Sequence, residues 1–220
     1  YHWSDYISPD ALEQFTANTG IKVNYDVYDS NEVLEAKLMA GGSGYDLVMP
    51  TGSYFERQVQ AKIYQAVDKT KLTNLKNLDQ GLADKVTLHD PGNLHNIPYA
   101  WGTIGIGYNQ AMLTERLGEG PFDSLDLLFD PKVAAKLADC GIAVLDSPAE
   151  IMAIANNYLG LDPNSESKKD LASASKMLAA VQPYYKYFHS SQYISDLANG
   201  EICVALGYNG DILQEQSRAV

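Results

Sequence analysis

The amino-acid sequence predicts an α/β protein in which mainly parallel sheets are flanked by helices. Segments with apolar residues at helical spacing alternate along the chain with short β-branched and aromatic segments, and glycine, proline or capping residues separate them. The 220 residues are 45% hydrophobic and 20% charged, which is enough apolar material for a buried core. A chain of this length can form one large domain or two lobes.

The charge excludes one class of partner. The chain carries 28 acidic and 16 basic residues, a formal net charge of −12. Such a protein repels the phosphate backbone, so we expect no nucleic-acid partner, whereas its field favours the approach of small cations. No run of about 18 apolar residues occurs, so we expect no membrane span. Tyr1 is not a natural start, and we expect that any signal peptide has been removed or was never included.

The first hundred residues alternate between predicted helices and strands. Residues 8–20 begin with serine and proline and end in glycine, which predicts a helix of about eleven residues. Residues 21–27 alternate as in a strand with one face covered, and residues 30–42 predict a second helix that paired glycines end. Residues 46–50 predict a short buried strand. This alternation is typical of a parallel sheet, whose ligands usually bind at the carboxyl ends of its strands.

The pattern changes in residues 96–108, where three glycines interrupt an aromatic and β-branched run. Such a segment favours extended backbone with bends, a natural place for the chain to cross between lobes. We therefore predict a first lobe in residues 1–103 and a second in residues 104–220, with a hinge near residues 101–104.

Helices and strands alternate again in the second part. The sequence predicts, in order, a helix after Asp130-Pro131, a strand at Cys140, a helix from Ser147-Pro148, a helix over 165–181, a strand over 185–189, a helix from Ser190 or Ser191 to Ala198, a strand at Cys203 and a helix from Asp211.

The chain has two cysteines, Cys140 and Cys203, each in an apolar run that predicts a buried strand. An even pair fits one disulfide in an exported protein, and two buried free thiols in a cytosolic protein fit the count equally well. The two predicted strands could lie close enough to be bridged. We favour the disulfide, and free thiols remain the alternative.

Few motifs point to catalysis. The histidines are scattered and none has the spacing of a zinc site: His2, His89, His95 and His189. The chain contains no Walker loop and no dinucleotide fingerprint, so we expect no metal and no cofactor. A hydrolase that uses a pair of carboxylates stays open, because acids are abundant and the spacing singles out no pair.

Acids and aromatics stand at predicted strand ends and helix starts. In the first part, two aromatic side chains surround a carboxylate in Trp3-Ser4-Asp5-Tyr6, which fits either a ligand site or an N-terminal anchor. Thr51 follows the predicted strand over 46–50 and fits a ligand-facing turn as well as an ordinary N-cap.

Similar candidates follow in the second part. Glu150 stands three residues after Ser147, a spacing that favours a capping box in which the carboxylate accepts from the Ser147 backbone N–H. Asp211 follows a predicted strand and is expected to cap the last helix. Tyr208 fits either the core or the wall of a site.

Several segments, in order and at nearly constant spacing along the whole chain, resemble the periplasmic polyamine-binding proteins, which are the putrescine and spermidine receptors of bacterial ABC importers. They are Trp3-Ser4-Asp5-Tyr6-Ile7, Gly20-Ile-Lys-Val, Asp29-Ser-Asn-Glu-Val-Leu34, Tyr45-Asp-Leu-Val-Met-Pro50, Gly105-Ile-Gly-Tyr-Asn109, Phe188-His-Ser-Ser191 and Asp196-Leu-Ala-Asn-Gly200.

The resemblance implies a two-lobed periplasmic-binding-protein fold that closes over a polyamine in its cleft. It implies a monomeric, periplasmic, non-enzymatic receptor that delivers its ligand to the membrane permease of an ABC importer. The residues that match ligand contacts of the family are Trp3, Ser4, Asp5, Tyr6, Thr51, Glu150, Ser190, Tyr208 and Asp211, with Ser191 as the alternative to Ser190 for a weaker polar contact.

Two departures from the family affect what can be expected. Many members have Trp where Tyr208 stands, so the preference between spermidine and putrescine is open. The chain also stops soon after Asp211, whereas relatives continue for about another third of their length, so we expect a fragment. Two other functions remain: a hydrolase that uses a carboxylate pair such as Asp5 and Asp211, and a protein-interaction module that keeps the receptor fold without the solute.

Overall fold

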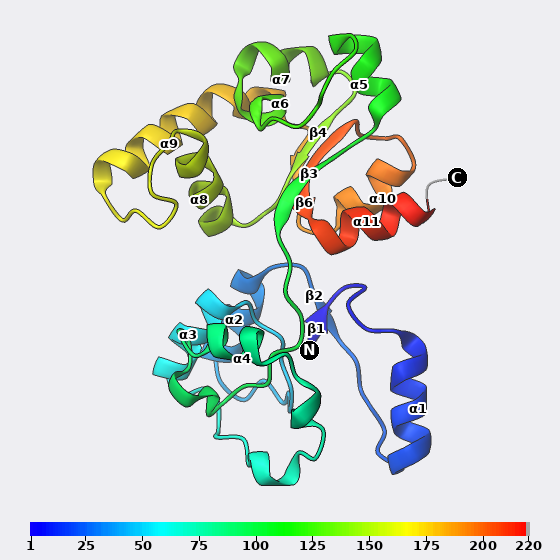
Figure 1. Cartoon of the computed structure of the whole chain (residues 1–220), viewed down its shortest axis with the longest axis vertical. Helices are drawn as coiled ribbons and strands as arrows, with labels where there is room; N and C mark the ends of the chain where they lie inside the picture. Colours follow the sequence, from blue (N-terminus) through cyan, green and yellow to red (C-terminus); the bar gives the residue numbers. More distant parts are fainter. Residues whose placement is uncertain (219–220) are drawn as a thin grey trace. The chain divides into compact units, whose positions relative to one another are not determined.

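The structure is a computed structural model that describes residues 1–218. The chain divides into two compact units, Tyr1–Trp101 and Gly102–Val220, whose elements are labelled in Figure 1. No helix in the described part of the chain is long and apolar enough to cross a bilayer.

The first unit is mostly helical, with one small sheet. Its elements are β1 (His2–Trp3), α1 (Pro9–Thr19), β2 (Val27–Tyr28), α2 (Asn31–Met39), α3 (Gly52–Gln60), α4 (Gln80–Val86) and the short 3₁₀ turns η1 (Lys69–Lys71), η2 (Leu75–Asn77) and η3 (Pro91–Asn93). Strands β1 and β2 are parallel, with His2 opposite Val27 and Trp3 opposite Tyr28.

Both predicted helices of this unit are confirmed. Helix α1 has 11 residues and ends at Gly20, whose φ of 72° is the left-handed conformation that a glycine adopts without strain. Helix α2 is capped by Ser30, whose side chain accepts a hydrogen bond from the Val33 backbone N–H. The capping residues therefore identified these helices correctly from the sequence alone.

The strand predictions for this unit are mostly wrong. Of residues 21–27 only Val27 lies in a strand, because β1 is two residues long and offers partners to Val27 and Tyr28 alone. Residues 46–50 form no strand. The carbonyl of Leu47 accepts from the Tyr1 amino group, and that of Met49 accepts from the Trp3 indole and the Tyr28 hydroxyl, so these donors replace a strand ladder.

The second unit contains the larger sheet. Its elements are β3 (Ile104–Tyr108), α5 (Gln110–Leu117), α6 (Asp126–Phe129), α7 (Pro131–Leu137), β4 (Ile142–Val144), α8 (Pro148–Tyr158), α9 (Lys168–Val181), η4 (Gln182–Tyr184), β5 (Tyr187–Phe188), α10 (Gln192–Ala198), β6 (Val204–Tyr208) and α11 (Asn209–Arg218). The strand order is β3-β6-β4-β5, and β4 runs parallel to both β5 and β6, while β3 is antiparallel to β6.

Three of the four strand pairings within residues 1–218 are parallel, which confirms the predicted α/β class with mainly parallel sheets. Every helix and strand predicted after residue 130 has a counterpart. Neither cysteine lies inside a strand, since Cys203 immediately precedes β6 and Cys140 lies two residues before β4.

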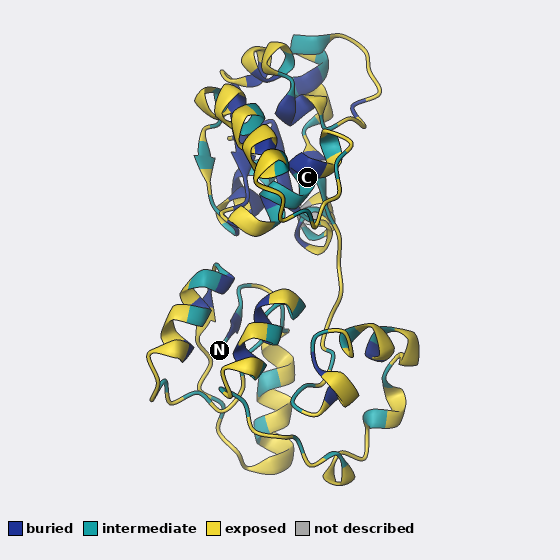
Figure 2. Ribbon diagram, turned by 90° about the vertical axis from the view of Figure 1, so that its left-hand side faces the viewer, coloured by how far each residue is buried: buried dark blue, intermediate teal, exposed yellow. Residues whose placement is uncertain are grey.

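Helices cover both faces of this sheet, and the side chains of its strands alternate between them (Figure 1). Ile142, Val144 and Leu206 pack with residues of α5 to α9. Ala143 and Ala205 pack with α10 and with Ile212 of α11. Figure 2 shows the central strands of this unit in the colour of buried residues.

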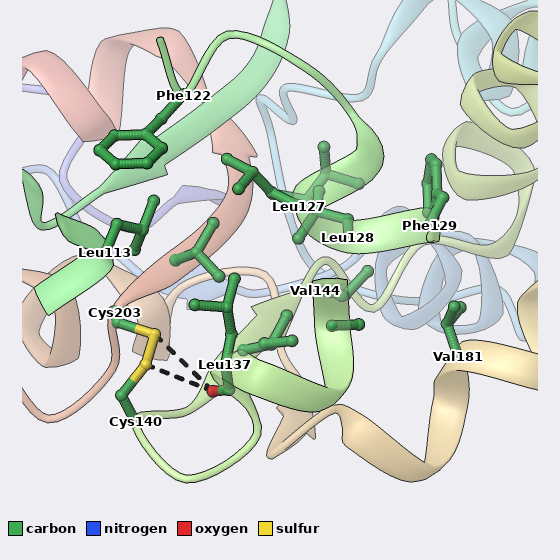
Figure 3. Packing of buried hydrophobic residues seen from close by; sticks show 14 of the residues in the cluster. Leu113, Phe122, Leu127, Leu128, Phe129, Leu137, Cys140, Val144, Val181 and Cys203 are labelled. Carbon is green, nitrogen blue, oxygen red and sulfur yellow. Dashed lines mark hydrogen bonds between the residues drawn. A yellow bond between two sulfur atoms is a disulfide. The ribbon is translucent and has the colours of Figure 1, made fainter. Parts of the chain in front are cut away.

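The predicted disulfide is present, and the free-thiol alternative is wrong. Cys140 and Cys203 are bonded across 63 positions of sequence, with their Cα atoms 5.4 Å apart. Figure 3 shows the bridge at the border of the larger core cluster, with the two sulfurs 3.3 and 3.8 Å from the carbonyl oxygen of Leu137. The bridge therefore ties the segment before β4 to the segment before β6.

Replacing both cysteines by serine is expected to lower the free energy of unfolding by about 2–5 kcal/mol, because the bridge restricts a long loop in the unfolded chain. Urea unfolding followed by circular dichroism measures the change. Reductant should destabilise the parent protein and leave the double variant unchanged. Equal midpoints for parent and double variant under oxidising conditions would show that the bridge contributes nothing.

A buried carboxylate orders the loop after α4 in the first unit. Asp90 is 1% exposed and accepts hydrogen bonds from the His95 backbone N–H at 2.7 Å, from His95 Nδ1 at 3.0 Å and from the Asn96 side chain at 2.8 Å. Burial alone raises the pKa of the Asp90 carboxyl. The hydrogen bonds from His95 and Asn96 outweigh it, so the pKa lies below its ordinary value of 3.8.

Because its pKa is lower in the folded state, Asp90 stabilises the protein above about pH 4, and this stabilisation is lost as the pH falls further. Asp90→Asn should therefore lower the free energy of unfolding by about 1–3 kcal/mol at pH 7. In this variant the free energy of unfolding should also fall less steeply than in the parent as the pH is lowered. Urea unfolding at a series of pH values between 2.5 and 7 tests this. The exposed Asp84 of α4 supplies the control, Asp84→Asn. If the free energy of unfolding falls as steeply with decreasing pH in Asp90→Asn as in the parent, the prediction is contradicted.

Candidate functional site

The predicted site residues fall into two groups, one in each unit, and most of them lie in or just after a strand, whereas Thr51 precedes α3. The first unit holds Trp3, Ser4, Asp5, Tyr6 and Thr51, and the second holds Glu150, Ser190, Tyr208 and Asp211. Each group is described within its own unit.

Ser4, Asp5 and Tyr6 of the first group lie in the turn between β1 and α1. Asp5 is exposed and has a φ of 60°, a left-handed conformation that Asp tolerates better than most residues. The Ser4 hydroxyl donates to Asp29 Oδ1 at 3.5 Å, and Asp29 directly follows β2. Because β1 and β2 are parallel, their carboxyl ends bring exposed acids to the same end of the small sheet.

Aromatic side chains anchor this turn, in agreement with the N-terminal anchor that was one of the two roles predicted for residues 3–6. The Trp3 indole donates to the Met49 carbonyl at 2.9 Å, and its ring lies 4.7 Å from the ring of Tyr28. The Tyr99 hydroxyl donates to the Tyr6 carbonyl. The anchor holds the backbone on either side of Asp5, while the Asp5 side chain stays exposed.

Thr51 occupies the N-cap position of α3, but its side chain makes no capping hydrogen bond. Its backbone N–H donates instead to the side-chain oxygen of Asn31, the buried first residue of α2, at 3.1 Å. This bond fixes the start of α3 against the start of α2.

The second group is built by the large sheet. The parallel strands β4, β5 and β6 end at the same edge, and after each of them a helix begins: α8, α10 and α11 (Figure 1). The edge therefore collects three helix N-termini, whose backbone dipoles place partial positive charge there. Carboxylates in these first turns are electrostatically favoured.

Glu150, in the first turn of α8, contacts the end of β6. The Tyr208 hydroxyl donates to Glu150 Oε2 at 2.8 Å. The predicted capping box is wrong, because the Ser147 side chain makes no capping bond and the Glu150 carboxylate reaches across to a neighbouring strand. Tyr208 is half-buried, so its ring lies at the border of the core.

Asp211 lies in the first turn of α11, two residues after the helix starts at Asn209, so the predicted capping role is wrong. Asn209, the first residue of the helix, is bonded to Thr103: its backbone N–H donates to the Thr103 carbonyl at 2.9 Å, and its side-chain oxygen accepts from the Thr103 N–H at 3.0 Å. Asp211 is 3% exposed, and its Oδ2 accepts from the Tyr193 hydroxyl at 2.5 Å.

Ser190 joins two strand ends. It is buried, and its hydroxyl accepts from the Asp146 backbone N–H at 3.2 Å, linking the residues after β5 to those after β4. The neighbouring Ser191 is the N-cap residue of α10, and its backbone N–H donates to His189 Nδ1 at 3.1 Å.

Sequence reasoning missed Asp29 and Tyr193 as members of these groups. Nothing in the local pattern distinguishes Tyr193 among 15 tyrosines. One signal was present in Gly207, because a glycine inside a strand often marks a close approach. A Cβ at Gly207 would lie 2.4 Å from Cε2 of Tyr193.

Both groups combine acidic side chains with aromatic ones. Carboxylates accept charge-assisted hydrogen bonds from cations, and aromatic faces attract cations and cover apolar linkers. Within residues 1–218, no group of three or more His, Cys, Asp and Glu side chains is arranged to hold a metal ion. Carboxylates beside aromatic rings are suited to binding an organic cation.

The sequence matches the family model of the bacterial extracellular solute-binding proteins over residues 10–218. It is 56% identical over 220 residues to the putrescine-binding periplasmic protein SpuD of Pseudomonas aeruginosa and 52% identical over 221 residues to the putrescine-binding periplasmic protein PotF of Escherichia coli. These matches include 100% of this chain and 60% of each relative, so the chain spans about three fifths of their length.

Two solved structures superimpose on this chain. A Listeria monocytogenes protein assigned as a spermidine/putrescine ABC transporter superimposes with a TM-score of 0.87 at 31% identity, covering 99% of this chain and 64% of that one. The TpPotD lipoprotein of Treponema pallidum superimposes with a TM-score of 0.80 at 26% identity, covering 98% and 64%. These superpositions confirm the predicted periplasmic-binding-protein fold, and SpuD and PotF are named as periplasmic proteins, the location predicted for this chain. The chain belongs to the bacterial extracellular solute-binding proteins.

Proposed function

We propose that the protein is a periplasmic receptor that captures a polyamine, putrescine or spermidine, and delivers it to the membrane permease of an ABC importer. Residues 1–103 would form one lobe and residues 104–220 the other, with rotation near residues 101–104 closing them over the ligand. The observation that carries the proposal is that each unit places carboxylates and aromatic side chains together at the carboxyl ends of its strands. The relatives SpuD and PotF, named for binding putrescine, support it.

The chemistry of a polyamine fits these side chains. The ligand carries an ammonium group at each end and methylenes between them. Each charge-assisted hydrogen bond from an ammonium to a carboxylate contributes about 1.5–3 kcal/mol, and an aromatic face adds about 0.5–2 kcal/mol. Burying four methylenes contributes roughly 3 kcal/mol at about 0.8 kcal/mol each. Asp5 and Asp211 would hold the two ends, with Trp3 and Tyr208 as walls.

In this proposal the protein binds a polyamine and does not catalyse its conversion. The relatives are named for binding solutes, which favours neither a hydrolase nor a protein-interaction module. The ligand would leave the protein chemically unchanged. Closure would then be driven only by the better contacts that the ligand makes in the closed form.

Asp5→Asn and Asp211→Asn should each weaken putrescine binding at least about tenfold, or about 1.4 kcal/mol, because each removes a charge that faces an ammonium group. Isothermal titration calorimetry of the protein at its natural length measures the affinities. Asp10→Asn, which neutralises an exposed acid in the first turn of α1, is the matched control and should bind like the parent.

Thermal unfolding provides a second measurement. Putrescine or spermidine at about 100 times the dissociation constant should stabilise the parent by about 2.7 kcal/mol. Absence of stabilisation by either amine, or affinities in both aspartate variants equal to that of the parent, would refute the proposed function.

Tyr208→Trp is expected to shift preference toward putrescine, because the larger ring leaves less room for the longer amine. Titrations with putrescine and spermidine give the ratio of the two affinities. Tyr208→Phe is the control, because it removes the hydroxyl that donates to Glu150 without adding volume. This variant should bind both amines more weakly and leave the ratio of their affinities unchanged. A spermidine-to-putrescine ratio that does not change in Tyr208→Trp would reject this role for Tyr208.

A further inference from the structure

Tyr193 links three elements of the second unit from inside the core. It lies on α10, has no exposed surface and packs with Ala143, Leu145 and Ala205 of the smaller core cluster. The hydroxyl at the end of its ring reaches the junction between β6 and α11. A buried hydroxyl requires hydrogen-bond partners, and these partners identify what the residue does.

The hydroxyl makes two hydrogen bonds whose directions are fixed. It accepts from the Tyr208 backbone N–H at 3.0 Å and donates to Asp211 Oδ2 at 2.5 Å. The directions follow from chemistry, because a backbone N–H can only donate and an ionised carboxylate can only accept. One hydroxyl therefore connects the last residue of β6 to the carboxylate in the first turn of α11.

The position of the ring depends on a glycine in β6. A Cβ at Gly207 would lie 2.4 Å from Cε2, 2.7 Å from Cζ and 3.0 Å from the hydroxyl oxygen of Tyr193. Any side chain at this position would push the ring away from the strand. The absence of a side chain at Gly207 is thus what lets the hydroxyl reach both of its partners.

We propose that Tyr193 is a positioning residue of the polyamine site, which holds the Asp211 carboxylate in place for an ammonium group without touching the ligand. This inference rests on the proposed function. The same hydroxyl holds the backbone of Tyr208, whose side chain donates to Glu150. Tyr193 therefore positions the junction between β6 and α11, which carries both Tyr208 and Asp211.

A tyrosine suits this task better than a basic residue. Its O–H orients the carboxylate but supplies no positive charge, so the carboxylate keeps its full negative charge for the ligand. A lysine or arginine at the same place would neutralise the group that has to attract an ammonium ion. Tyr193→Phe keeps the ring and removes only the hydroxyl.

A double-mutant cycle tests the inference. Putrescine affinity is measured by calorimetry for the parent at its natural length, Tyr193→Phe, Asp211→Asn and the double variant. Tyr193→Phe alone should weaken binding by about 5- to 30-fold, whereas in the Asp211→Asn background the same change should cost less than about twofold. This coupling is a readout that a purely structural role would not produce.

Tyr187→Phe is the matched control. The Tyr187 hydroxyl donates to Asp196 Oδ2 at 2.8 Å, so this variant also removes a tyrosine–aspartate hydrogen bond to α10, but one that involves neither Tyr208 nor Asp211. It should lose stability without losing affinity. Gly207→Ala is a second variant, which keeps every polar group but displaces the Tyr193 ring, and it should weaken binding as Tyr193→Phe does.

The outcomes separate this inference from the proposed function. If the parent binds putrescine and the effects of Tyr193→Phe and Asp211→Asn are additive, the positioning role is overturned and the receptor function stands. Equal losses of affinity in Tyr187→Phe and Tyr193→Phe would also overturn it. If the parent binds neither putrescine nor spermidine, the proposed function fails, and the inference fails with it.

Discussion

The parallel alignment of β4, β5 and β6 is the constraint on which the second unit depends. It brings three strand ends and three helix starts to one edge, so Glu150, Ser190 and Asp211 lie along that edge although they come from three segments of the chain. A slip of one residue in this register would exchange the faces of the sheet. The small side chains of Ala143 and Ala205 would then no longer face α10, and Tyr193 could not reach the end of β6.

Tyrosine hydroxyls orient many of the carboxylates of this protein. The chain has 28 acidic residues against 16 basic ones, so ion pairs cannot serve them all, but it has 15 tyrosines. Tyr208 donates to Glu150, Tyr158 to Asp126, and Tyr54 to Glu32. For Tyr158, the hydrogen bond to Asp126, followed by burial, raises the pKa of the phenol to about 12, so the phenol stays a donor at neutral pH. Neutral donors fix carboxylates while preserving the negative field that attracts cations.

The sequence predicted what is determined locally and missed what depends on distant partners. The capping serine and the glycine at either end identified α2 and α1, because those signals act within one turn. The prediction of a strand over 46–50 was wrong, because the Met49 carbonyl accepts hydrogen bonds from the side chains of Trp3 and Tyr28, which are distant in sequence. Glu150 was predicted as a cap, since no local pattern reveals that Tyr208, 58 residues away, supplies its hydrogen bond. The family resemblance singled out Glu150 and Asp211 as candidate ligand contacts, where spacing alone favoured capping.

The proposed function requires that the protein recognise two ammonium groups at once. The most direct measurement compares, by calorimetry, putrescine with butylamine, which has the same four methylenes and one ammonium group. If carboxylates hold both ends, putrescine should bind at micromolar concentration or below, and butylamine at least about tenfold more weakly, because one anchored charge is lost. Comparable affinities for the two amines would contradict the claim.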